Sequence, residues 1–231
     1  MKIKNIALVG NPNCGKTSLF NTLTGTRQKV ANYAGVTVER KEGSFKLPSG
    51  DAVRVLDLPG TYSLKPSSLD EEVTRAVCLG ELKGEVLPDI FICVVDATNL
   101  SLHLSLVLEV RALNRPMILV LNMMDEVKKR GISIDKDKLS QLLGIPVVEA
   151  VAVKTKGIQD LINQLDQKNL FITPYHSELS HFEQVKQITK QVILNNDSGD
   201  KRTAFLDKIF LHPVLGLVTV SYTHLTLPTT P

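Results

Sequence analysis

Residues 10–17 read Gly-Asn-Pro-Asn-Cys-Gly-Lys-Thr, a complete match to the phosphate-binding pattern G-x-x-x-x-G-K-[ST]. An apolar, strand-like run over residues 3–9 precedes the match, and a helix-like stretch over residues 16–24 follows it. This context matters because the glycines let successive backbone N–H groups face a polyphosphate, and the following helix adds the positive end of its dipole. The segment therefore predicts a site for a nucleoside triphosphate.

The contacts of this loop can be predicted residue by residue. Lys16 is expected to reach the β- and γ-phosphates, and the Thr17 hydroxyl is expected to bind Mg²⁺. The loop residues expected to contact the nucleotide are Gly10, Asn11, Pro12, Asn13, Cys14, Gly15, Lys16, Thr17 and Ser18. The alternative is a glycine-rich turn that carries a lysine by chance, and the strand-like and helix-like flanks argue against it.

A second motif predicts which base is bound. Residues 122–125 read Asn-Met-Met-Asp and follow the apolar run 117–121, and N-x-x-D at a strand end is the guanine reader of GTPases. The Asp125 carboxylate can accept hydrogen bonds from guanine N1–H and the 2-amino group, whereas adenine would leave it unpaired. Asn122 is expected to bridge the nucleotide to the phosphate loop. The residues expected at the base are Asn122, Met123, Met124 and Asp125. In isolation, the motif is also compatible with a surface turn.

A D-x-x-G motif lies between these two, at the end of the apolar run 53–56. Asp57 is expected to hold the water shell of Mg²⁺, and Gly60 is expected to let a backbone N–H meet the γ-phosphate. The residues of this motif predicted to line the site are Asp57, Leu58, Pro59 and Gly60.

Thr37 is the candidate for the first switch. It lies twenty positions after Thr17 and twenty before Asp57. In GTPases such a threonine closes over Mg²⁺ while the γ-phosphate is present and is released after hydrolysis. The predicted switch contacts are Gly35, Val36 and Thr37. Threonines are common in loops, so the prediction depends on the position of Thr37 between the phosphate loop and the D-x-x-G motif.

The fifth predicted motif follows the strand-like run 146–151. Residues 152–154 read Ala-Val-Lys, where many GTPases have Ser-Ala-Lys. A backbone N–H near Ala152 is expected to contact the guanine O6, Val153 to lie beside it, and the Lys154 stem to cover the face of the base.

The motifs in this order resemble the TrmE–Era–Septin-type branch of P-loop GTPases. Within that branch, the amino-acid sequences of five segments resemble the cytoplasmic GTPase domain of the bacterial ferrous iron transporter family FeoB. These segments are residues 10–21, 32–43, 57–64, 94–100 and 121–125. The similarity is close over residues 1–167 and looser to about residue 217. It implies binding of GTP, GDP and Mg²⁺, hydrolysis of GTP to GDP and phosphate, and regulation of ferrous iron uptake from the cytoplasmic face of the inner membrane.

The resemblance also implies a second cation. Ras-type GTPases carry a water-orienting glutamine after D-x-x-G, and here Thr61 takes that position. In relatives, K⁺ stabilises the transition state, bound by the asparagine three positions before the loop lysine, which is Asn13 here, and by backbone carbonyls of the switch near residues 32–35. Hydrolysis is therefore expected to be slow and K⁺-stimulated. The alternative is that Asn13 only shapes the loop. The implied catalytic group is Lys16, Asn13, Thr37 and Gly60; the implied Mg²⁺ ligands are Thr17, Thr37 and Asp57, with Asn13 for K⁺.

Strand-like and helix-like segments alternate, which is typical of a doubly wound, mostly parallel α/β sheet, here the P-loop GTPase fold. The predicted strands are residues 3–9, 41–47, 52–57, 89–96, 116–122 and 146–152. The predicted helices are residues 16–24, 68–80, 101–114, 135–143 and 157–167. The charged run 126–130 is predicted to be a solvated loop.

The pattern divides the chain into three parts. Residues 1–167 are predicted to be the GTPase domain. Residues 168–217 are predicted to be a short helical extension, with one helical face over 178–194, that leads to a truncated first membrane helix. The apolar run 209–220 is shorter than the roughly 20 residues a membrane helix needs. Residues 221–231 are interpreted as a non-native tail. The fragment itself is expected to be soluble. The implied partners are the membrane permease part of the same full-length chain and small accessory Feo proteins.

Composition restricts the remaining alternatives. The 231 residues carry a net charge of +3, too small to argue for a nucleic-acid partner. The three cysteines show neither paired nor metal-ligand spacing, which favours a reducing cytosolic setting. Two other functions stay open. One is a TrmE/Era-like assembly GTPase acting on RNA, which would need a basic appendage. The other is a nucleotide-gated binding module with incidental hydrolysis.

Overall fold

A computed structural model describes residues 3–25, 27–150, 155–167 and 179–195, together with Tyr175 and Ser177. The predicted base-side contacts Ala152, Val153 and Lys154 lie outside these residues. So do the apolar run 209–220 and the tail 221–231.

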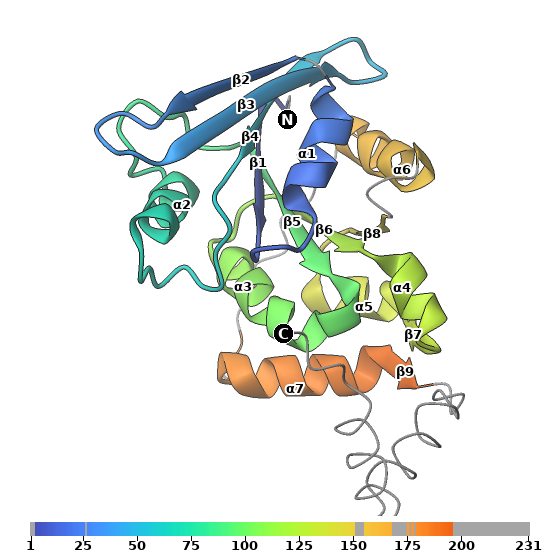
Figure 1. The fold of residues 1–231 in the computed structure, drawn as a ribbon. Helices are drawn as coiled ribbons and strands as arrows, with labels where there is room; N and C mark the ends of the chain where they lie inside the picture. The colour runs from blue at the N-terminus through green and yellow to red at the C-terminus, as the bar shows by residue number, and fades with distance from the viewer. Residues whose placement is uncertain are drawn as a thin grey trace, which may run out of the picture.

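A seven-stranded sheet forms the centre of the molecule, with the strand order β2-β3-β4-β1-β5-β6-β8 (Figure 1). The strands β4, β1, β5, β6 and β8 are parallel, and β3 runs antiparallel between β4 and β2. The strand bounds are β1 Asn5–Gly10, β2 Gln28–Asn32, β3 Glu39–Lys46, β4 Ala52–Asp57, β5 Ile90–Asp96, β6 Met117–Asn122 and β8 Val147–Glu149. The predicted doubly wound, mostly parallel α/β fold is confirmed.

Helices cover both faces of this sheet (Figure 1). Helices α1 and α6 pack on one face, and α2, α3, α4, α5 and α7 contribute to the apolar layer on the other. The helix bounds are α1 Lys16–Thr24, α2 Leu69–Leu79, α3 Leu100–Ala112 with a preceding 3₁₀ turn Ala97–Asn99, α4 Met124–Lys129, α5 Lys136–Leu143, α6 Thr155–Asp166 and α7 His181–Val192.

The central strands show why the chain folds in this way. Residues Ile90–Val95 of β5 are all buried, and their side chains alternate between the two apolar layers, as expected for a parallel strand covered on both faces. Phe91 and Cys93 pack toward α3, and Ile90 and Ile92 toward α1. The polar residues are confined to the strand ends, which places the predicted motifs at the carboxyl edge of the sheet.

Helix α7 lies beside α3 and α5 (Figure 1). It begins with a capping box in which the Ser180 hydroxyl accepts from the Glu183 N–H and the Glu183 carboxylate accepts from the Ser180 N–H. Tyr175 links α7 to α3, because its hydroxyl donates to the Gln184 side chain of α7 and its ring centre lies 5.3 Å from the Arg111 guanidinium of α3. The helical extension therefore packs directly on the α/β core.

Two predictions of local structure were wrong. The charged run 126–130 was expected to be a loop, but Glu126 and Lys129 lie in α4 and form an i,i+3 ion pair of 2.6 Å. The helical face over 178–194 ends earlier than predicted, since α7 stops at Val192. Residues Ile193–Asn195 form strand β9, which pairs with β7 (Ile132–Ile134) in a second, two-stranded sheet. In the described part of the chain, no helix is long and apolar enough to span a membrane.

Candidate nucleotide-binding site

The phosphate loop joins β1 to α1 and has the backbone shape that anion binding requires. Asn13 and Gly15 both have left-handed conformations, with φ of 61° and 89°. A Cβ on Gly15 would lie 2.0 Å from the side-chain nitrogen of Asn122, so the loop and β6 approach too closely for a side chain at this position. Left-handed residues turn successive N–H groups inward, which makes a concave site for an anion.

Asn122 connects this loop to the predicted base motif. Its side-chain nitrogen donates to the Cys14 carbonyl at 2.9 Å, and both residues are buried. The expected bridge from the base motif to the phosphate loop is therefore present on its loop side; its contact with a nucleotide stays a prediction.

Three predicted residues from two elements meet at the floor of the site. The Lys16 ammonium lies 2.6 Å from Asp57 Oδ1, and the Thr17 hydroxyl donates to Asp57 Oδ2 at 3.0 Å. The side chains of Lys16 and Asp57 are only 8% and 3% exposed, so each charge needs the other. They meet because Asp57 ends β4 beside β1, at the edge where the phosphate loop begins.

The residues at this floor fit a magnesium ion. A threonine hydroxyl and a carboxylate are hard oxygen donors, and Mg²⁺ is usually held by one or two such groups together with substrate phosphates. Thr17 and Asp57 provide them, whereas the third predicted ligand, Thr37, is exposed and is not brought to them. In the described residues, no group of three His, Cys, Asp or Glu side chains could hold a metal ion by itself.

Gly60 lies directly over the phosphate loop. A Cβ on Gly60 would meet the Cα and N of Pro12 at 3.0 Å, so the two motifs are in backbone contact. They enclose a cavity of about 610 Å³, lined by Asn11, Pro12, Asn13, Gly15, Lys16, Thr17, Ser18, Gly60, Asp70 and Met123. A smaller cavity of about 240 Å³ continues past Asp57 and Pro59 to Val38 and Glu39.

The first switch segment is folded against the core. Tyr33 is 2% exposed, and its N–H donates to the Val38 carbonyl at 3.0 Å. The Val36 N–H donates back to the Tyr33 carbonyl at 3.2 Å, and Gly35 supplies the left-handed residue of this turn, with φ of 81°. The turn keeps Thr37 on the surface.

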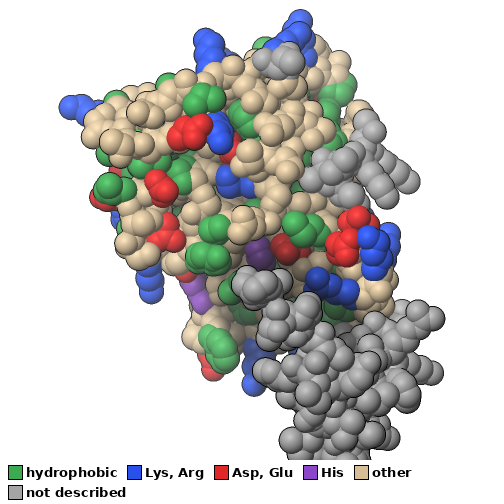
Figure 2. All heavy atoms as spheres, viewed as in Figure 1, with side chains coloured by type: hydrophobic (Ala, Val, Ile, Leu, Met, Phe, Trp, Pro, Cys, Tyr) green, Lys and Arg blue, Asp and Glu red, His purple; other side chains and the backbone are tan. Residues whose placement is uncertain are grey.

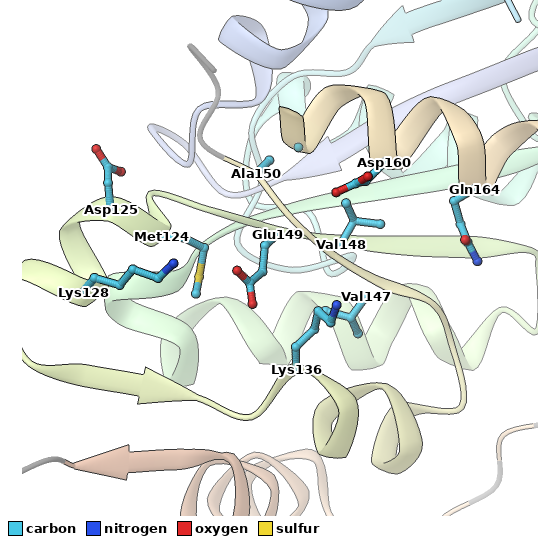
Figure 3. A pocket seen from close by; sticks show the side chains of 11 residues that line it. Met124, Asp125, Lys128, Lys136, Val147, Val148, Glu149, Ala150, Asp160 and Gln164 are labelled. Atoms are coloured by element: carbon cyan, nitrogen blue, oxygen red, sulfur yellow. The ribbon is translucent and has the colours of Figure 1, made fainter. Parts of the chain in front are cut away.

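Asp125 lies in the first turn of α4 and lines a third cavity. Figure 3 shows its carboxylate directed away from the side chains of Lys128 and Glu149, which point toward the interior of this cavity. The cavity has a volume of about 580 Å³ and reaches Ala150, where the described residues stop before α6.

Some predicted contacts have buried side chains, although Met124 and Leu58 also line the base-side and phosphate-side cavities. The side chains of Leu58, Cys14 and Met124 are at most 5% exposed and pack in the apolar layers. Burial raises the pKa of the Cys14 thiol to about 11. Conversely, Asp70 lines the two phosphate-side cavities although no motif indicated it, because it lies in the first turn of α2 and its position depends on packing.

Comparison with known proteins agrees with this geometry. The family model described as Ferrous iron transport protein B matches residues 4–165. The chain belongs to the FeoB family. The resemblance noted in the sequence is thereby confirmed.

Individual relatives extend the match beyond the α/β domain. The chain is 46% identical over 188 residues to the Fe(2+) transporter FeoB of Salmonella typhimurium, an alignment that covers 80% of this chain and 23% of the relative. The corresponding protein of Escherichia coli K12 is 45% identical with the same coverage. The chain thus spans about a quarter of the length of these FeoB relatives.

Solved structures of FeoB cytosolic domains have the same fold. The cytosolic domain of L. pneumophila FeoB superposes with a TM-score of 0.75 and 32% identity, covering 83% of this chain and 100% of that one. The cytosolic domain of T. maritima FeoB in a GDP form gives a TM-score of 0.72 and 33% identity, with coverage of 84% and 99%. The fold is therefore that of the P-loop GTPase domain of FeoB.

Proposed function

We propose that the chain is the GTP-binding and GTP-hydrolysing part of a ferrous iron transporter. Hydrolysis regulates or drives uptake of Fe²⁺ through the membrane permease part of the full-length chain, at the cytoplasmic face of the bacterial inner membrane. The observation that carries this proposal is the convergence of Lys16, Thr17 and Asp57 beneath Gly60, combined with membership of the FeoB family.

The proposed chemistry follows from the charges at the floor of the site. When a nucleotide binds, Lys16 would leave its ion pair with Asp57 and contact the β- and γ-phosphates, whose negative charge would compensate its own. The Asp57 carboxylate and the Thr17 hydroxyl would hold Mg²⁺, which would supply positive charge against the phosphates. The backbone N–H at Gly60 donates to the γ-phosphate, and Thr37 moves in from the surface to close the site.

The proposed domain organisation assigns residues 1–167 to the GTPase domain and 168–217 to a helical extension. The direct packing of α7 on α3 and α5 supports an extension that senses the state of the core. Small accessory Feo proteins are further proposed partners. No nucleic-acid partner is proposed, because on the face shown in Figure 2 the described Lys and Arg side chains are dispersed, with Asp and Glu side chains among them.

The specificity for guanine can be tested at Asp125. Asp125→Asn should weaken GTP binding by at least tenfold and improve binding of xanthosine triphosphate, because the amide can donate to the additional oxygen of xanthine. A fluorescent-nucleotide titration measures both affinities. The control is Asp137→Asn, which makes the same change in the first turn of α5, outside the site. Unchanged GTP affinity in Asp125→Asn would remove this residue from the base site.

The proposed K⁺ stimulation is supported by the side chain that replaces the glutamine. Thr61 is completely buried, and its hydroxyl donates to the Ser63 carbonyl at 2.6 Å, so it is not free to orient water. A cation bound by Asn13, which lines the phosphate cavity, would supply the missing stabilisation.

Exchange of Na⁺ for K⁺ at constant ionic strength should therefore raise the GTP hydrolysis rate about tenfold, which is roughly 1.4 kcal/mol of barrier. Asn13→Ala should abolish the difference while GDP affinity changes little. A wild-type rate that is indifferent to K⁺ would refute the cation site, and the GTPase assignment would stand without it.

A further inference from the structure

The chain segment that follows the D-x-x-G motif is held by a carboxylate from α3. The Ser63 hydroxyl lies 2.9 Å from both Glu109 carboxylate oxygens and donates to them, and the Leu64 N–H donates to Glu109 Oε2. Hydrogen bonds to an ionised acceptor are roughly twice as strong as neutral ones. Glu109 therefore fixes the backbone at residues 63–64 to a helix that is itself packed into the apolar core.

The other end of the segment is fixed to the phosphate loop. The Thr61 N–H donates to the Gly10 carbonyl at 3.2 Å, and the Thr61 hydroxyl closes a tight turn by bonding to the Ser63 carbonyl. The Ser63 N–H returns a bond to the Thr61 hydroxyl at 3.2 Å. The Glu71 carboxylate of α2 also holds this turn, because it accepts from the Thr61 hydroxyl at 3.2 Å and from the Tyr62 N–H at 3.5 Å. Residues 61–64 thus form a short turn attached at Gly10, Glu71 and Glu109, and Gly60 lies immediately before it.

Among the described residues, every side-chain hydrogen bond of Glu109 is to the turn 61–64. Its neighbours Leu106, Val107, Leu108 and Val110 are buried apolar residues, and within the described part of the chain no Lys or Arg forms an ion pair with Glu109. A half-buried carboxylate without a cation is unfavourable unless N–H and O–H groups satisfy it. Here, Ser63 and Leu64 supply those donors.

We infer that Glu109 is a positioning residue for GTP hydrolysis. By fixing residues 63–64, it keeps Gly60 against Pro12, in the place where the proposed function needs the Gly60 N–H to meet the γ-phosphate. This inference rests on the proposed function, since it needs the chain to hydrolyse GTP. Glu109 lines neither of the two phosphate-side cavities, and it acts through the turn 61–64.

The experiment compares Glu109→Gln with the wild-type chain in steady-state GTP hydrolysis. The amide keeps the size of the side chain but loses the charge and one acceptor, so the turn loosens. We expect kcat to fall about tenfold, which corresponds to roughly 1.4 kcal/mol, while KM and GDP affinity stay within twofold. Glu81→Gln is the matched control, because Glu81 forms only an exposed pair with Arg75 and its substitution should leave kcat unchanged.

A second variant reaches the same contact from the other side. Ser63→Ala removes the hydroxyl and leaves α3 intact, and the double variant Ser63→Ala/Glu109→Gln should be no slower than Glu109→Gln alone, because both changes remove one interaction. Hydrogen exchange at the Leu64 amide provides a readout without turnover: its protection should be lost in Glu109→Gln and kept in Glu81→Gln.

The outcomes separate the two proposals. A wild-type chain that does not hydrolyse GTP refutes the proposed function. Normal wild-type turnover with unchanged kcat in Glu109→Gln refutes the positioning role alone. Equal losses of kcat and GDP affinity would also refute it, since they would indicate general damage to the fold.

Discussion

At the scale of single residues, two positions of the phosphate site leave no room for any side chain. Gly15 and Gly60 both lie where a Cβ would meet another motif, the first at Asn122 and the second at Pro12. The phosphate loop is therefore in close contact with both the D-x-x-G and the N-x-x-D motifs. Any residue other than glycine would separate motifs that have to act together.

Gly15→Ala provides a test with a matched control. Gly15 and Gly50 share the same left-handed φ of 89°, but the space around Gly50 is open, whereas a Cβ at Gly15 meets the Asn122 amide. Gly50→Ala should cost about 1–2 kcal/mol of unfolding free energy from the backbone alone. Gly15→Ala should cost more and should reduce GTP affinity at least tenfold, because Asn122 must release the Cys14 carbonyl.

Chemical denaturation and nucleotide titration of both variants measure these effects. Equal losses of stability and equal, unchanged GTP affinities in the two variants would show that the Gly15–Asn122 contact is unimportant.

At the scale of elements, the sequence predicted the parallel strands and most helices because their burial pattern is local. Val94 and Leu121, for example, lie in continuous apolar runs that only a covered sheet can accommodate. The phosphate loop, D-x-x-G and N-x-x-D motifs were also predicted from local sequence, because each one directly follows an apolar run that forms a strand.

The missed strands have no buried pattern of their own and depend on their pairing partners. Strand β2 is exposed at all five positions and is a strand only because the next strand, β3, pairs with it. Strands β7 and β9 have three residues each, and their pairing joins segments about sixty positions apart. For the same reason, no local pattern indicated that Glu109 of α3 would bind the turn after Gly60, because that contact depends on how α3 packs.

At the scale of the whole molecule, the two apolar layers enclose every cysteine of the chain. Cys14 lies in the phosphate loop, Cys78 in α2 and Cys93 in β5, and each is at most 2% exposed. Burial raises the pKa of Cys78 to about 12 and that of Cys14 to about 11, and it also raises the pKa of Cys93 well above the usual thiol value. At neutral pH, almost none of the three is present as the reactive thiolate.

The reaction rates of these three natural thiols therefore report how often the structure around each of them opens. In the native state, a colorimetric disulfide reagent at pH 7.5 should react slowly with all three thiols, and in denaturant it should react rapidly with all of them. Cys14 should react first under native conditions, because its loop lies at the surface of the sheet edge while Cys93 is central.

Added GTP should slow the labelling of Cys14 selectively, as peptide mapping of the modified protein can verify. Rapid native labelling of one equivalent that GTP does not change would mean that the phosphate loop opens independently of its ligand. If the expected result is obtained, the rate at which Cys14 is modified measures how often the phosphate loop opens in the absence of nucleotide.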